Sequence, residues 1–233
     1  MSNPVFLCPN LSGDQVVLDG PEGRHAALVR RIRVGEVVDL VDGVGTRCTG
    51  PVVATTKQTI TVCLAERVLE APPAPQITLV QALAKGDRGE LAVELATEVG
   101  VDVVVPWSAA RCVVSWSGDG GAKPLERWRS TAREAGKQSR RAWFPVVTRA
   151  ATTREVAALA GTVLVLHEQA SVPLSGLDLV GDVVLVVGPE GGIGPEELAL
   201  LGGTAVRLGA SVLRTSTAGA AAAAVVSART GRW

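Results

Sequence analysis

Hydrophobic residues follow two different patterns along the chain. Up to residue 70 they form short β-type runs, such as Val37–Val41, separated by turn signals at Asp42-Gly43 and Gly50-Pro51. A short helix is predicted between two of these runs, over Glu22–Arg33. The pattern therefore predicts a small β-rich domain over residues 1–70.

From residue 77 onward, β-type runs alternate with helical segments. Helices are predicted at Gly89–Val99 and Pro124–Arg141, and an alanine-rich helix at Ser216–Arg229. Strand runs such as VDVVVPW and DVVLVV separate them. Such alternation predicts a mostly parallel sheet with helices on both faces. We therefore expect an α/β domain over residues 77–233, joined to the β-rich domain by a stiff proline-rich linker at residues 71–76.

Composition narrows the class of protein. Hydrophobic residues make up 47% and charged residues 20% of the 233 residues, which is enough for a packed core. No apolar run approaches a membrane span, and the first residues do not resemble a secretory leader, so we expect a cytoplasmic protein without a membrane partner. The four cysteines are far apart with no CxxC, which predicts neither a disulfide framework nor a metal site.

The segment GPEGGIGPEEL, which follows the buried strand run Asp182–Val187, is the strongest candidate for ligand binding. Open α/β sheets bind ligands where a strand ends in such a glycine-rich loop. The phosphate fingerprints GxxxxGK[ST] and GxGxxG are both absent, and Glu190 would repel a pyrophosphate. The loop is therefore predicted to hold a neutral or cationic ligand with adenine and ribose groups; the alternative is a tight turn without a ligand.

Charge is balanced overall but concentrated locally. The net charge is zero, yet residues 123–149 carry eight basic side chains against Glu126 and Glu134. Four of the basic side chains recur at i,i+4 spacing on the predicted helix, where like charges repel by roughly 0.2–0.5 kcal/mol per pair. An anion such as an RNA backbone would relieve this repulsion. The alternative is a solvated face that the two glutamates partly neutralise. The row consists of Arg129, Arg133, Lys137 and Arg141.

His167 and Glu168 end the strand run VLVLHE, at the predicted ligand edge of the sheet. A histidine there is a possible base because its pKa lies near neutrality, although a structural hydrogen bond is the more common role. The sequence contains no Ser-His-Asp grouping, nucleophile elbow or HExxH motif, so no hydrolase motif is present.

Four ordered matches resemble one family. The first match, the pair GPEGGIGPEEL and LGASVLRTSTA, resembles the SPOUT class of S-adenosylmethionine-dependent RNA methyltransferases, and specifically the RsmE family, which methylates N3 of a uridine in 16S ribosomal RNA. LVRRIRVGEVVDLVDGVG is similar to that family's N-terminal PUA-like domain. KGDRGELAVELATEVGVDVVVPWSAARC resembles the opening of its methyltransferase domain, and RWRSTAREAGKQSRRAWFP its arginine- and glutamine-bearing helix. The resemblance implies a small N-terminal PUA-like β-barrel, a C-terminal SPOUT-type α/β domain with a deep trefoil knot, and a homodimer that builds the active site.

The resemblance also implies which residues carry function. S-adenosylmethionine would be the cofactor, and 16S rRNA or the small ribosomal subunit the partner, with no metal involved. The expected cofactor contacts are Leu166, His167, Glu168, Gly188, Pro189, Glu190, Gly191, Gly192, Ile193, Leu208, Gly209, Leu213 and Arg214. The expected RNA contacts are Arg24, Arg30, Arg31, Arg33, Arg129, Arg133, Lys137, Arg140 and Arg141.

Two side chains are candidates for the chemistry. Arg214 would stabilise negative charge on the uracil oxygens, and Glu190 would favour the sulfonium or act as a base. A helix cap or a pair with Arg214 is the competing role for Glu190, and His167 or water are the other possible bases. Two rival functions remain: a non-catalytic RNA-binding or ribosome-assembly protein, and a nucleotide-dependent small-molecule enzyme.

Overall fold

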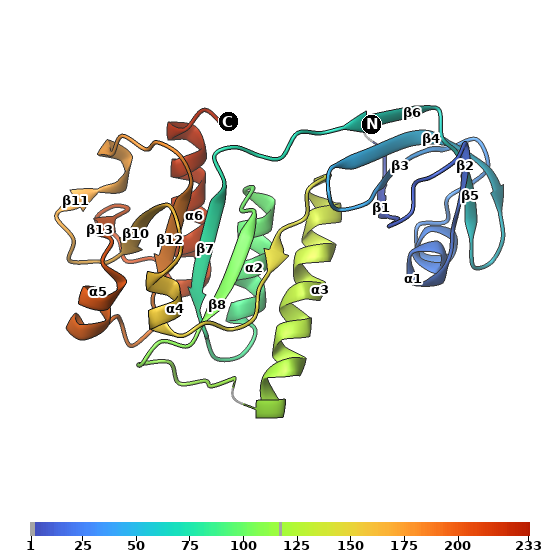
Figure 1. The fold of residues 1–233 in the computed structure, drawn as a ribbon. Helices are drawn as coiled ribbons and strands as arrows, with labels where there is room; N and C mark the ends of the chain where they lie inside the picture. Colours follow the sequence, from blue (N-terminus) through green and yellow to red (C-terminus); the bar gives the residue numbers. More distant parts are fainter. Residues whose placement is uncertain (1–2, 117) are drawn as a thin grey trace. The chain divides into compact units, whose positions relative to one another are not determined.

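The structure is a computed structural model that describes residues 3–116 and 118–233 (Figure 1). The chain forms two compact units. The first contains Met1–Pro72 and Gly136–Phe144, and the second contains Pro73–Ala135 and Pro145–Trp233. The domain bounds 1–70 and 77–233 remain predictions from the sequence. The two compact units divide the chain differently, because residues 136–144 belong to the first unit.

A six-stranded sheet forms the first unit. Its order is β1-β3-β4-β5-β2, with β6 paired to β4, and only the β1–β3 pair is parallel among the described pairs. Inward side chains alternate with outward ones and form a separate core that includes Phe6, Leu40 and Ile60, as expected for a sheet with one buried face. The strands are β1 (Val5–Leu7), β2 (Gln15–Leu18), β3 (Val37–Val41), β4 (Thr46–Thr55), β5 (Ile60–Cys63) and β6 (Glu66–Leu69).

The helix predicted over Glu22–Arg33 is shorter than expected. It consists of α1 (Gly20–Arg24), which starts with a proline in its first turn, followed by a π-helical turn at His25–Val29. The chain then leaves the helix, and Arg31 has a left-handed backbone with φ of 55°. The prediction failed because the arginine-rich segment has no apolar stripe long enough to hold a longer helix on the sheet.

The turn predicted at Gly50-Pro51 was also wrong. Both residues lie inside β4, where Gly50 pairs with Val38. A Cβ atom at Gly50 would lie 1.8 Å from the carbonyl oxygen of Cys63, so glycine is needed here for a close approach of two backbones. The glycine at position 50 is explained by the packing of the two strands and does not mark a turn.

Residues 136–144 belong to the first unit through aromatic and polar contacts. The indole of Trp143 donates a hydrogen bond of 2.9 Å to the carbonyl of Glu70, and its ring fills the space beside Gly45. Arg47 donates to the carbonyl of Arg140 at 2.8 Å. These contacts are between residues far apart in the sequence, which is why hydrophobic periodicity did not indicate them.

The second unit is built on a seven-stranded sheet in the order β11-β13-β10-β12-β7-β8-β9, with every described pair parallel. The central strands β7 and β12 are buried at every residue, which explains their continuous hydrophobic runs. The strands are β7 (Ile77–Ala82), β8 (Val103–Trp107), β9 (Val146–Val147), β10 (Thr162–Leu166), β11 (Val172–Pro173), β12 (Val183–Val187) and β13 (Thr204–Arg207).

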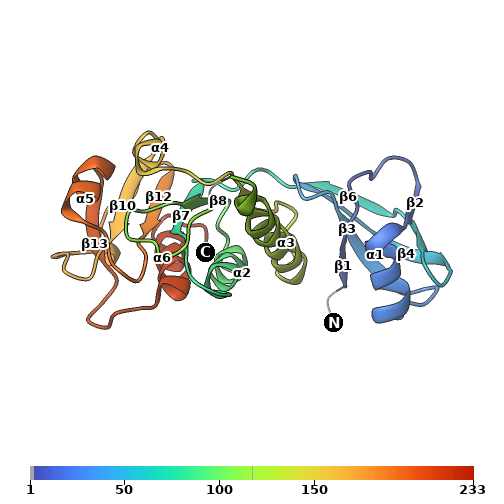
Figure 2. The same cartoon turned by 90° about the horizontal axis from the view of Figure 1, so that it is seen from below.

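Helices cover both faces of this sheet (Figure 2). One core packs α2 and α6 against the strands, and a second core on the other face includes residues of α4 and α5. This arrangement confirms the predicted α/β class. No helix among the described residues is long and apolar enough to cross a membrane. The helices are α2 (Arg88–Glu98), α3 (Ala122–Gln138), α4 (Thr153–Ala157), α5 (Pro195–Leu201) and α6 (Thr215–Arg229), with 3-10 turns at Gly118–Gly121 and Leu174–Gly176.

Candidate functional site

Three loops at the carboxyl ends of β10, β12 and β13 enclose a cavity of about 710 Å³. The three strands are adjacent, because β10 lies between β12 and β13 in the sheet. The loops therefore meet at one edge although they are far apart in the sequence. All thirteen residues predicted to contact a cofactor line this cavity: Leu166, His167, Glu168, Gly188, Pro189, Glu190, Gly191, Gly192, Ile193, Leu208, Gly209, Leu213 and Arg214.

Local backbone conformation and packing explain two of the glycines in the loop after β12. Gly192 has a φ of 73°, a conformation that favours glycine, and its amide closes a turn on the Pro189 carbonyl at 2.9 Å. A Cβ at Gly188 would lie 2.6 Å from the side chain of Ile193. The loop therefore folds tightly back on itself and leaves its backbone exposed along the cavity.

Glu190 is held by Arg88, at the start of α2. The distance from Oε1 of Glu190 to the Arg88 guanidinium is 2.8 Å. Burial raises the pKa of Glu190, but a hydrogen bond to its own backbone and the bond and charge of Arg88 outweigh burial and hold the pKa below its usual value. From the sequence we expected Glu190 to face a positive ligand, to cap a helix or to pair with Arg214; in the structure it pairs with Arg88.

Arg111 lines the cavity and was missed by the sequence analysis. It follows β8, and its Nη1 donates a hydrogen bond of 3.1 Å to the carbonyl of Gly191. The amide of Ala110 donates to Oε1 of Glu197 at 2.8 Å, which fixes the segment that carries Arg111. No sequence motif connects Arg111 with the distant glycine loop. The only indication in the sequence that Arg111 has a function is that the segment around it resembles the methyltransferase domain of the family.

His167 has structural hydrogen bonds. Its amide donates to the Val206 carbonyl at 2.9 Å, and its Nδ1 accepts the Gln169 amide at 3.2 Å. Arg214 is the N-cap residue of α6, and its carbonyl accepts the amides of Thr217 and Ala218. The side chain of Arg214 has no ion-pair partner among the residues that the structure describes.

The residues of the cavity fit a cofactor such as S-adenosylmethionine. Small-ligand sites usually span about 300–1,000 Å³, and this cavity lies in that range. Apolar side chains such as Leu166, Leu208 and Leu213 provide walls for an adenine ring, while arginines and glutamates line the same space. Among the described residues, no group of three or more histidine, cysteine, aspartate or glutamate side chains is arranged to hold a metal ion.

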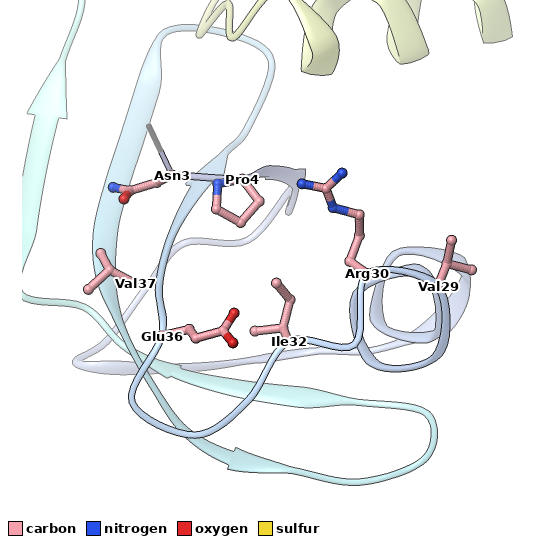
Figure 3. Close-up of a pocket in the computed structure, with 7 residues that line it drawn as sticks. All are labelled: Asn3, Pro4, Val29, Arg30, Ile32, Glu36 and Val37. Atoms are coloured by element: carbon pink, nitrogen blue, oxygen red, sulfur yellow. The ribbon is translucent and has the colours of Figure 1, made fainter. Parts of the chain in front are cut away.

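The basic residues of the first unit are exposed. Arg24, Arg30, Arg31 and Arg33 all lie on the surface, and none forms an ion pair within residues 3–116 and 118–233. Arg30 borders a separate cavity of about 530 Å³, where its guanidinium and the carboxylate of Glu36 both face the opening (Figure 3). The cavity is lined by Asn3, Pro4, Val29, Arg30, Ile32, Glu36 and Val37.

The predicted basic row of α3 is shorter than expected. Arg129 and Arg133 are exposed on the helix, with Glu126 at 4.0 Å and 3.0 Å from their guanidinium groups. Lys137 is only 8% exposed, and its Nζ lies 2.6 Å from Glu22 in the first unit. The expectation that Lys137 is an exposed RNA contact is therefore wrong, because burial and this pair make it structural.

The end of α3 changes the rest of the row. The helix ends at Gln138, and Arg140 has a left-handed backbone with φ of 56°. Arg141 consequently lies outside the helix and does not continue the i,i+4 row, which is reduced to Arg129 and Arg133. Arg140 remains exposed, and its carbonyl accepts the bond from Arg47.

Comparison with known proteins gives consistent matches along the chain. The family model described as RNA methyltransferase domain matches residues 71–227, and the model described as RNA methyltransferase PUA domain matches residues 18–62. The protein named ribosomal RNA small subunit methyltransferase E of Mycobacterium bovis is 47% identical over 234 aligned residues, covering 95% of this chain and 89% of that protein.

Two solved structures share the whole fold. One is ribosomal RNA small subunit methyltransferase E of Neisseria gonorrhoeae bound to S-adenosylmethionine, with a TM-score of 0.87, 28% identity and coverage of 97% of this chain and 98% of that one. The other is a Legionella pneumophila protein solved with the same cofactor, with a TM-score of 0.88, 27% identity and coverage of 98% of both chains.

Proposed function

This chain belongs to the RNA methyltransferase family whose curated members are named ribosomal RNA small subunit methyltransferase E, and on that premise we propose that it transfers a methyl group from S-adenosylmethionine to small-subunit ribosomal RNA. The observation that carries the proposal is the cavity at the ends of β10, β12 and β13. Every residue that family resemblance assigns to the cofactor lines that one cavity. A non-catalytic RNA-binding protein needs no such arrangement.

The proposed target is N3 of a uridine in 16S rRNA, which family resemblance supplies. When bound, S-adenosylmethionine provides an electrophilic methyl group and leaves as S-adenosylhomocysteine. The N3–H bond of the uracil breaks, an N3–carbon bond forms, and the proton passes to a base or to water. The task of the protein is to hold the two reactants in line and to stabilise the charge that develops on the uracil.

Arg214 is the proposed electrostatic catalyst. Its side chain lines the cavity at the N-terminus of α6, a helix end that itself favours negative charge. From there the guanidinium would stabilise the uracil oxygens as N3 loses its proton. Glu190 is a weaker candidate for the base than the sequence suggested, because Arg88 lowers its pKa and occupies Oε1. His167 is also a weak candidate for the base, because its Nδ1 accepts the Gln169 amide and the neutral ring therefore carries its proton on Nε2.

The proposed RNA contacts come from both units. Exposed arginines without carboxylate partners favour phosphate binding. In the described part of the chain this holds for Arg24, Arg30, Arg31 and Arg33. Arg129, Arg133, Arg140 and Arg141 extend the proposed contacts in the second half of the chain. We further propose a homodimer, a trefoil knot formed by the cofactor loops, and a cytoplasmic location, where ribosomal RNA is found.

Mass spectrometry of ribosomal RNA incubated with the protein and labelled S-adenosylmethionine tests this function. We expect one labelled methyl group on N3 of a uridine. Gly191→Trp should abolish transfer, because the indole would occupy the cavity beside Arg111. Val180→Trp is the matched control, since Val180 is 85% exposed and outside the cavity. RNA binding without any transfer would instead support the non-catalytic alternative.

A further inference from the structure

We propose that Arg111 anchors the α-carboxylate of S-adenosylmethionine, an inference that rests on the function proposed above. The methionine half of this ligand carries one carboxylate, next to a positive ammonium and a positive sulfonium. A protein that encloses such a group must supply hydrogen-bond donors, because an unpaired carboxylate removed from water is costly. A guanidinium is the best-matched donor, since its planar fork can bind both oxygens at once.

Arg111 is already oriented at the cavity wall. Its Nη1 donates to the carbonyl of Gly191 at 3.1 Å, and the guanidinium lies along the glycine loop. A methyl group at Gly194 would be 3.7 Å from Nη2 and 3.8 Å from Nε of Arg111. These are ordinary contact distances, so the guanidinium lies directly beside the backbone of the glycine loop. Because an arginine has five N–H donors and this bond uses one, donors remain for a carboxylate.

The segment that carries Arg111 is held in place from the other side. Glu197, in the first turn of α5, accepts the amide of Ala110 at 2.8 Å and the hydroxyl of Thr153 at 2.8 Å. The loop after β8 is thus tied to the same helix that begins after the glycine loop. A backbone segment held in this way loses less conformational entropy when a ligand binds to the side chain that it carries.

Neighbouring arginines are less suited to the role. Arg88 reaches the same loop, but Glu190 neutralises it at 2.8 Å. Arg207 and Arg214 line the cavity, yet neither side chain has a hydrogen bond to the protein among the described residues that would fix its direction. Arg111 combines a cavity position, an orienting bond and the absence of a carboxylate partner within the described part of the chain.

The test compares two ligands that differ only in the carboxylate. Isothermal titration of the full chain measures the Kd of S-adenosylhomocysteine and of its decarboxylated analogue. For Arg111→Gln we expect the Kd of S-adenosylhomocysteine to rise by about 10- to 100-fold, the range for losing a charged hydrogen-bond pair. The Kd of the decarboxylated analogue should change little, so the preference of the protein for the carboxylate should nearly disappear.

Arg88→Gln and Arg207→Gln are the matched controls, and both should keep the wild-type ratio of the two Kd values. An equal loss for both ligands in Arg111→Gln would overturn the proposal, because it would mean that Arg111 only shapes the loop. Unchanged affinities would overturn it too. If Arg111→Gln does not fold, Arg111→Lys gives the same readout: a reduced ratio supports the forked contact, and the wild-type ratio contradicts it.

The function and this inference fail in different ways. If the wild-type protein methylates ribosomal RNA and binds S-adenosylhomocysteine, but the ratio does not depend on Arg111, only the inference is wrong. If the wild-type protein binds neither ligand, the proposed function and the inference fall together.

Discussion

Glu190 and Glu197 flank the glycine loop, and each is held by a different part of the chain. Glu190 pairs with Arg88, whereas Glu197 accepts bonds from the Ala110 amide and the Thr153 hydroxyl. The sequence pattern placed Glu190 near a positive ligand and gave no functional role to Glu197. In the structure both carboxylates brace the loop, so the charged side chains of the cavity that are left to meet a ligand are Glu168 and the arginines.

Because Arg88 pairs with Glu190, removing the Arg88 charge should shift the pKa of Glu190. In Arg88→Gln the pKa of Glu190 should rise toward its usual value near 4.5, because the bond and charge that lower it are lost. A lowered pKa in the folded state means that the pair stabilises the protein above pH 4.5 and that this contribution disappears as the pH falls through the folded-state pKa. Carboxyl-carbon NMR titration measures the change, with Arg127→Gln as the control.

A difference in stability between wild type and Arg88→Gln should therefore be present at neutral pH and shrink in acid. A pKa for Glu190 that is the same in both proteins would show that Arg88 does not set it. Both side chains are more than a third exposed, so the stability difference should be small.

Lys137 should contribute to folding more than to RNA binding. Lys137→Met removes the partner of Glu22, whose other oxygen accepts the Leu7 amide at 3.1 Å. We expect the first unit to lose about 2–3 kcal/mol of stability, because the Glu22 carboxylate is left largely buried without its cation. Hydrogen exchange of peptides from the first unit measures this loss.

Adding Glu22→Gln to Lys137→Met should recover part of the stability, since replacing both partners costs less than removing one. The salt dependence of RNA binding should stay at the wild-type slope. A stable Lys137→Met protein with a shallower salt slope would instead restore Lys137 to the RNA-binding surface.

At the scale of elements, strand β4 shows how a local signal can be misleading. Gly50-Pro51 is a common turn pair, yet the strand continues through it because the backbone of Cys63 approaches Gly50 closely. The end of α3 has a similar cause: Trp143 and neighbouring residues pack into the first unit and stop the helix at Gln138. Strand identity in the parallel sheet was predictable because full burial leaves a continuous apolar run.

Gly50→Ala tests this account of β4. The added methyl would be 1.8 Å from a carbonyl oxygen, so β4 and β5 must separate, and we expect a loss of about 3 kcal/mol or more. Hydrogen exchange should increase in the first unit and remain unchanged in the second. Gly176→Ala is the control, because its methyl would make only an ordinary contact at 3.5 Å. Wild-type protection in Gly50→Ala would refute the close-approach explanation.

At the scale of the whole molecule, the cavity depends on strand order. Leu166 ends β10, and Gly188 and Leu208 follow β12 and β13; these strands are adjacent only because β10 lies between the other two. Periodicity identified the strands but not their order, and the set of residues came from family resemblance. Arg111 was missed because its loop reaches the cavity through bonds to Gly191 and α5, which no spacing in the sequence encodes.

A dimer that shares its active site makes a prediction for mixed protomers. Gly191→Trp should have no working cofactor cavity, and Arg129→Glu with Arg133→Glu should have no RNA surface on α3. If the α3 arginines of one protomer serve the cavity of the other, a heterodimer of these two inactive proteins has one complete site. Two different affinity tags on co-expressed chains isolate that heterodimer, and its methylation rate should reach about half of the wild-type value, because one of two symmetry-related sites is intact.

The mixed experiment has three distinct outcomes. An active heterodimer supports the shared site, whereas a stable but inactive one means that each protomer uses its own arginines with its own cavity. Recovery of no doubly tagged protein would contradict the homodimer itself. Each tagged variant alone must be inactive and able to fold, which thermal unfolding of the homodimers checks. Because neither parent has a complete site in either arrangement, activity of the mixture requires residues from two chains to act on one RNA.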